Sequence, residues 1–175
     1  MTPQQLQQEI AMNYKIEIDQ IIGRSLINLQ AIKSCIATLI VCENEDITDK
    51  KLANSTFTTL IEGPIDNLIP RIEESKPNLF DTEELKEIAK KEKDLIYHIY
   101  PSGKYHTARM QDTKDLNPMG EYFEEKRKQY IGAASKYLST QKEFCLDNSF
   151  TYILANHKYN LDRINQNPIT NNQLP

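Results

Sequence analysis

One uninterrupted helical pattern near the amino terminus constrains the fold more than any other feature of this sequence. From about Ile10 to Val41 the apolar residues recur every three or four positions, which places them on one wide face of a helix. Gly23 does not reset the register, so we treat it as an interior residue that costs about 1 kcal/mol relative to alanine. The residues on this face are Tyr14, Ile18, Ile21, Ile22, Leu29, Ile32, Ile36, Leu39 and Ile40. Such a helix spans roughly 45 Å at 1.5 Å per residue, enough to contact every other element of a small domain.

Local signals place the ends of this helix and of the helices that follow it. Thr2, Pro3 and Gln5 supply an N-cap, a first-turn proline and a capping-box partner, so the long helix is expected to begin at Pro3. Asp81 and Glu84 form the same kind of start signal for a helix to about residue 99, with Ile96 on its inner face. Further helices are expected over residues 47–61 with Leu52 on the inner face, over 64–74 with an interruption at Pro70, over 117–144 with Asn117-Pro118 as the start signal, and over 148–164.

The sequence therefore predicts an all-α protein, an up-and-down bundle of four to five helices around a long central N-terminal helix. A composition of 39% hydrophobic and 26% charged residues with only five glycines is ordinary for such a fold. Residues 1–164 are expected to form one domain and residues 165–175, which are polar and contain two prolines, a flexible tail.

Charge and targeting signals restrict the expected partners and compartment. With 21 basic and 25 acidic side chains the chain has a formal charge of -4, so nucleic-acid binding is not expected. The most apolar window contains Arg24 and Lys33, which argues against a transmembrane segment. No classical signal peptide and no CxxC spacing among the three cysteines are found, so we expect a cytoplasmic protein without a cofactor. Delivery by a specialised secretion system would leave no such mark.

Three helices each place one polar residue where the periodicity calls for an apolar one. These residues are Ser25, Glu92 and His157. Buried polar groups must be paired, because an unpaired carboxylate in a core costs several kcal/mol or takes up a proton. A hydroxyl, an imidazole and a carboxylate are also the parts of a nucleophile, base and orienting acid, but no nucleophile elbow surrounds Ser25. We therefore favour structural hydrogen bonds for all three.

Two further patterns are typical of ligand sites. The carboxylate pairs Glu84/Glu87 and Glu121/Glu124 have the spacing by which a helix offers two oxygens to a metal, yet acidic residues also favour helix starts without one. The connection over residues 97–109 interleaves tyrosines with basic and titratable groups and contains Ser-Gly-Lys, which would suit a phosphate. GxxxxGK is absent, so this connection is not a Walker loop.

The favoured function is a helical interaction module of the adaptor, chaperone, inhibitor or effector type. Tyrosines of the helix over 117–144 cover a wider arc than a buried stripe needs, and tyrosine and arginine are enriched at interfaces. We expect a protein partner at this face and the neighbouring loop, and the same surface would allow self-association. The alternative is a small metal-dependent or nucleotide- or phosphate-directed hydrolase with its site in the bundle or the loop. The candidate binding residues are Tyr100, Lys104, Tyr105, His106, Arg109, Tyr122, Lys126 and Arg127.

Overall fold

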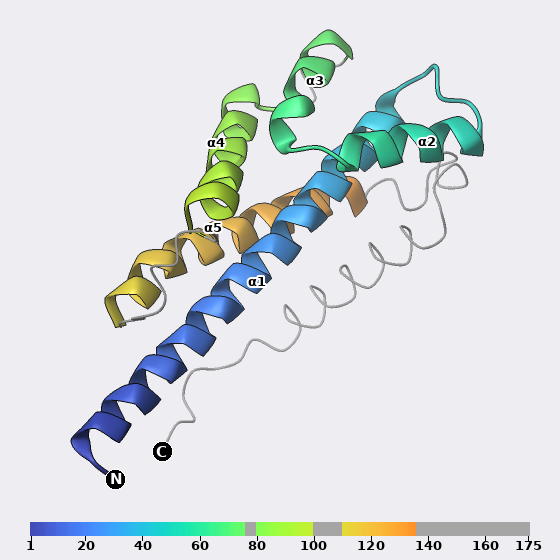
Figure 1. The fold of residues 1–175 in the computed structure, drawn as a ribbon. Coiled ribbons are helices and arrows are strands. Elements are labelled where there is room, and N and C mark those ends of the chain that lie inside the picture. The colour runs from blue at the N-terminus through green and yellow to red at the C-terminus, as the bar shows by residue number, and fades with distance from the viewer. Residues whose placement is uncertain (76–79, 100–109, 136–175) are drawn as a thin grey trace, which may run out of the picture.

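A computed structural model describes residues 1–75, 80–99 and 110–135, and about 88% of these residues are helical. No strand occurs among them, so the all-α class and the long N-terminal helix are confirmed. Figure 1 shows the arrangement of the helices. The elements are α1 (Pro3–Glu43), α2 (Lys50–Ile61), the 3-10 turn η1 (Ile65–Asn67), α3 (Ile69–Ser75), α4 (Thr82–Lys93), the π-helix η2 (Asp94–Ile99) and α5 (Met110–Ser135).

α1 is continuous over 41 residues, with Gly23 inside it. The expected capping box is present: the Thr2 hydroxyl accepts from the backbone N–H of Gln5, and the Gln5 side chain accepts from the backbone N–H of Thr2. Ile18, Ile32 and Ile36 are completely buried, as the periodicity predicts. The capping signal and the apolar face therefore placed this helix correctly.

α1 also contains an 18-residue window with a mean hydropathy of 1.6, long and apolar enough to cross a membrane. In the structure 72% of that window is buried by the rest of the protein. The core helix of a soluble protein and an N-terminal signal sequence share these properties, so the expectation that α1 does not span a membrane stays a prediction.

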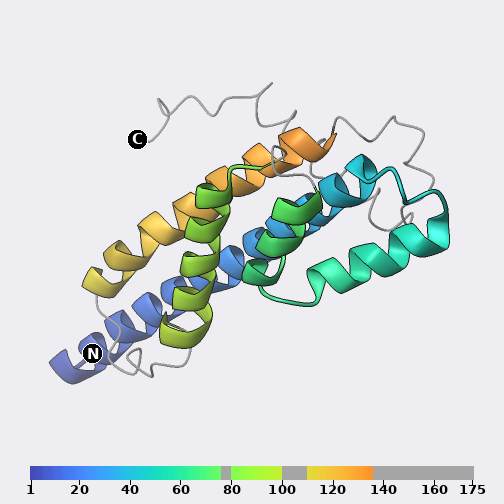
Figure 2. The same ribbon diagram turned by 90° about the horizontal axis from the view of Figure 1, so that it is seen from above.

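α5 lies alongside α1 and runs in the same direction, as both views show (Figures 1 and 2). The two helices approach closely at Gly120, where an added Cβ would lie 3.3 Å from Cγ2 of Ile21. Phe123 and Ile131 are almost completely buried in the same core. This close contact holds the α5 residues that face α4 at a fixed position.

α4 crosses the α1–α5 pair and runs opposite to α5. Glu84, near its start, contacts Tyr130, while Lys91, near its end, lies over Tyr122. Leu85, Ile88 and Ala89 are buried against the core. The first-turn side chains of α4 therefore meet the C-terminal half of α5.

Three expectations about helix boundaries and faces are wrong. α5 begins at Met110, with Pro118 inside it, although Asn117-Pro118 looked like a helix start. An interior proline removes one backbone hydrogen bond, but the earlier turns bring Leu116 into the core at 7% exposure. The π-helical turns of η2 change the phase after Lys93, and Ile96, expected on the inner face, is exposed. Leu52, also expected inward, is exposed on α2.

Candidate functional site

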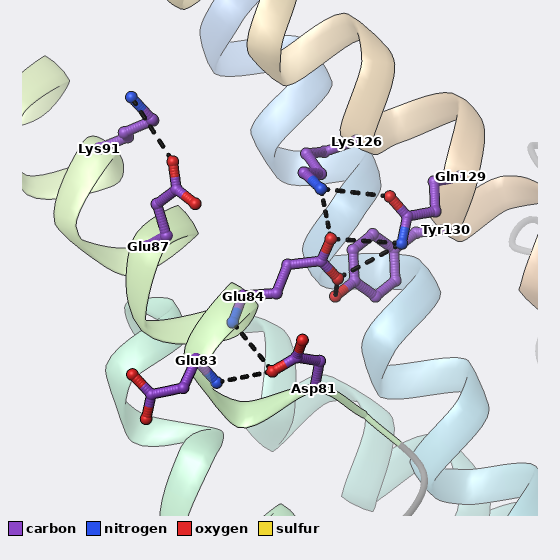
Figure 3. A network of polar contacts seen from close by, with 8 residues as sticks. All are labelled: Asp81, Glu83, Glu84, Glu87, Lys91, Lys126, Gln129 and Tyr130. Carbon is purple, nitrogen blue, oxygen red and sulfur yellow. Dashed lines mark hydrogen bonds and ion pairs between the residues drawn. The ribbon is translucent and has the colours of Figure 1, made fainter.

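A network of polar side chains centred on Glu84 joins α4 to α5 (Figure 3). The Glu84 carboxylate forms an ion pair with Lys126 and accepts a hydrogen bond from the Tyr130 hydroxyl at 3.0 Å. Gln129 Nε2 donates to both Glu84 oxygens at 3.3 Å. Asp81 caps the N-terminus of α4, where its carboxylate accepts hydrogen bonds from the backbone N–H groups of Glu83 and Glu84. The Glu84 side chain, expected to complete a capping box with Asp81, instead reaches across to α5.

The electrostatics of the network keep Glu84 ionised. Burial raises the pKa of this carboxyl group, but the hydrogen bonds from Lys126 and Tyr130 outweigh it, so the pKa is below its ordinary value. Burial, followed by the nearby Glu84 charge, raises the pKa of the Tyr130 hydroxyl, which therefore stays a neutral donor. Both Glu84 oxygens have partners, so this carboxylate has a structural role that the sequence did not reveal.

The middle of the α4–α5 contact is a cation–π arrangement around Tyr122. Lys91 Nζ lies 4.7 Å and Lys126 Nζ 5.7 Å from the centre of the Tyr122 ring. The rings of Tyr122 and Phe123 lie in an edge-to-face arrangement with their centroids 5.7 Å apart. The Tyr122 hydroxyl oxygen is buried and has no hydrogen-bond partner in the described part of the chain. Tyr122 and Lys126, both candidate binding residues, therefore lie together at the contact with α4.

Arg127, the third described candidate, does not join them. It follows Gly120 by seven residues, or about two turns, so it lies on the side of α5 that faces α1. The side chain is half-buried, and its Nε is buried without a hydrogen bond among the described residues. The structure thus divides the predicted α5 binding set between the two sides of the helix.

Two small hollows flank α5. One of about 200 Å³ lies beside the Glu84 network and is lined by Phe80, whose ring stacks on Tyr130 at 6.2 Å, and by Leu39 of α1. The other, about 190 Å³, lies between α1 and α5 and is lined by Arg24, Asn28, Glu121 and Glu124 among others.

The Glu124 carboxylate of the second hollow is already compensated by cations. A hydrogen bond from Lys128 lowers the pKa of Glu124, and the charges of Arg127 and Arg24 lower it further. The described residues contain no cluster of three or more side chains that would hold a metal ion. Neither Glu84/Glu87 nor Glu121/Glu124 therefore gains a third ligand from the described structure.

Glu92 has two partners that lie far from it in the sequence. Its carboxylate accepts from the backbone N–H of Ile65 at 2.8 Å and lies 3.8 Å from Lys33 Nζ of α1. Burial raises the pKa of Glu92, and the Ile65 N–H and the Lys33 charge only partly oppose this. Both charged side chains are at most 10% exposed, so they form a buried pair that ties α4 and η1 to α1. The sequence feature that could have indicated this pair is Lys33, a charged residue in the most apolar window of α1.

Ser25 is buried as predicted, and its hydroxyl donates to the backbone carbonyl of Ile21 at 2.8 Å. Its hydrogen bond is therefore local, and Glu92 is paired elsewhere. The remaining candidates lie outside the described residues. They are Tyr100, Lys104, Tyr105, His106, Arg109 and His157.

The exposed element next to this site is η2, which continues α4 and contains residues 97–99 of the expected 97–109 connection. Tyr97 is 67% exposed and Ile96 is 36% exposed, whereas Leu95 is buried at 1%. The π-helix thus turns one aromatic and one aliphatic side chain to solvent at the end of the α4–α5 contact. Comparisons with protein-family models, curated proteins and solved structures gave no match.

Proposed function

We propose that this protein is a helical interaction module that binds a protein partner, with η2 as the central contact. The observation that carries this proposal is the exposure of Tyr97 and Ile96 on a π-helical segment. π-Helical insertions are frequent at functional sites, and an exposed tyrosine provides a large amphipathic surface at low entropic cost. The basic Lys91 and the Tyr122 ring lie on the adjoining helices.

The rigid support of this surface favours binding. The Glu84 network and the Gly120 contact fix α4 and α5 relative to α1, so an exposed side chain on η2 is presented by a preformed scaffold. The candidate residues of the 97–109 connection follow η2 directly in the chain. A partner seated on Tyr97 would therefore also meet this connection.

Photo-crosslinking in the native source tests the proposal. A photoreactive phenylalanine analogue is placed at Tyr97, and a matched one at Leu52, which is also exposed but lies on α2. We expect one defined protein adduct from position 97 and none of that size from position 52. No adduct from position 97, or identical adducts from both positions, would contradict the proposal.

We also propose that the helices form a single up-and-down bundle over residues 1–164 and that the protein is cytoplasmic. The opposite directions of α4 and α5 support the bundle. The free thiol of Cys35, buried in the core, supports a reducing compartment. Burial raises the pKa of Cys35 to about 12, so this thiol is an unreactive part of the core.

A further inference from the structure

α1 carries an apolar stripe on the side that faces away from its core residues. Met12, Ile16 and Ile27 are 59%, 49% and 64% exposed. Steps of 100° per residue place these three and Gly23 within about 60° of one another, opposite Ile18. We call Met12, Ile16, Gly23 and Ile27 the outer stripe.

The same side of α1 is closed further along the helix. Thr38 and Val41 fall on the side of the outer stripe and are completely buried. α2 packs against this C-terminal half of α1 (Figure 1). The outer stripe therefore continues, toward the N-terminus, a side of α1 that is buried in the C-terminal half of the helix.

We propose that residues 148–164 of this same chain dock on the outer stripe. This segment lies outside the described residues, and its sequence predicts an amphipathic helix. Its apolar residues fall within about 100° of one another at helical spacing, so they need one apolar partner surface. They are Phe150, Ile153, Leu154, Leu161 and Ile164.

The lengths of the two stripes agree. From Phe150 to Ile164 a helix rises about 21 Å, and from Met12 to Ile27 it rises about 22 Å, both at 1.5 Å per residue. A helix of this segment would therefore cover the outer stripe from end to end.

The connectivity also fits. Ala133, near the end of α5, lines the same hollow as Leu39 of α1, and Leu39 is roughly 18 Å along the helix from Ile27. The 12 residues over 136–147 span about 40 Å when extended, so Phe150 reaches Ile27. From there the segment runs antiparallel to α1.

The antiparallel direction sets a register that matches large residues with open positions. With Phe150 beside Ile27, Leu161 comes beside Ile16 and Leu154 comes opposite Gly23. A Cβ at Gly23 would meet nothing within 4 Å, which leaves room for a leucine. His157 then comes beside the exposed Gln20, whose amide can pair with the imidazole. The one polar residue of the segment's face thus meets a polar position of α1.

Hydrogen exchange on the full chain tests this docking. We expect the amides of residues 150–164 to exchange at least about tenfold more slowly than in an unstructured peptide, and to lose this protection in the variant I16E/I27E. Leu52→Glu adds a carboxylate at another exposed apolar position and should leave the protection unchanged. Hydrogen exchange in peptides from α5 shows whether each variant is folded. Absent protection, or protection that I16E/I27E leaves intact, would overturn the proposal.

A reciprocal variant removes any dependence on α1 folding. I153E/L161E changes only the segment, and hydroxyl-radical oxidation of Met12 should rise several-fold in it, while Met1 serves as the exposed reference. Unchanged Met12 oxidation would overturn the proposal. Protection of Met12 that depends on protein concentration would assign the outer stripe to a second copy, and protection that needs phosphatidylcholine vesicles would assign it to a lipid surface. Either result would also overturn docking by residues 148–164.

Discussion

The buried Lys33–Glu92 pair makes a quantitative prediction about what joins α4 to α1. Glu92→Gln keeps an oxygen that can accept from the Ile65 N–H but removes the charge opposite Lys33. Lys33→Met keeps the apolar stem and removes the ammonium group. Each single variant leaves one buried charge without its ionic partner, which costs about 3 kcal/mol or somewhat more.

The double variant should recover much of this loss, because neither charge is then left alone. We expect K33M/E92Q to be about 1 to 2 kcal/mol less stable than the parent, which gives a coupling energy of about 4 kcal/mol or more. Urea denaturation at pH 7, followed by circular dichroism, measures all four free energies of unfolding. Single-variant losses that add within about 0.5 kcal/mol would show that the two side chains do not interact and would refute this account.

The pair also predicts a dependence on pH. The pKa of Glu92 is raised in the folded state, so its contribution to stability is greatest below its ordinary value of 4.5 and declines as the pH rises through the folded value. Lys33→Met removes a cation that opposes this shift. The destabilisation caused by Lys33→Met should therefore be smaller at pH 5 than at pH 8, and the reverse order would contradict the burial of Glu92.

Two further outcomes follow from the core and the α4–α5 network. Ile36→Asp should unfold the domain, because an unpaired charge at a completely buried position costs several kcal/mol, comparable to the total stability; melting within a few degrees of the parent would show that the face of α1 is misassigned. The pKa of Glu84 is lowered in the folded state, so its stabilisation is present above 4.5 and lost as the pH falls through the folded value. The stability difference between the parent and Glu84→Gln should therefore shrink on acidification, whereas Glu83→Gln, at an exposed position, should show little change; a difference that grows would refute the ion pair with Lys126.

Periodicity and capping predicted α1 because both signals are local and agree with each other. The pattern also placed Ser25 and Glu92 in the core, since burial follows from the helical phase. The predicted start of α5 was wrong because Asn117-Pro118 is only a local signal. The burial of Leu116 favours a helix that begins earlier and continues through the proline. The prediction that Ile96 faces the core was wrong because a π-helix shifts the phase that a constant step of 100° per residue assumes.

Contacts between helices were beyond the reach of the sequence. The acidic pairs suggested metal ligands or helix-start electrostatics, whereas Glu84 pairs with Lys126, 42 residues away. Glu92 pairs with Lys33 and with the backbone of Ile65, and no spacing rule connects these positions. Which charges meet depends on how α4 crosses α1 and α5, and that geometry arises from the packing of all three helices.

The affinity of the purified partner for the parent protein and for Tyr97→Ala tests the central claim most directly. A tyrosine at the centre of an interface contributes about 2 kcal/mol or more, so calorimetry should show Kd rising about 30-fold for Tyr97→Ala. Leu52→Ala, at an exposed apolar position on α2, should leave Kd unchanged. An equal Kd for the parent and Tyr97→Ala would contradict binding through η2.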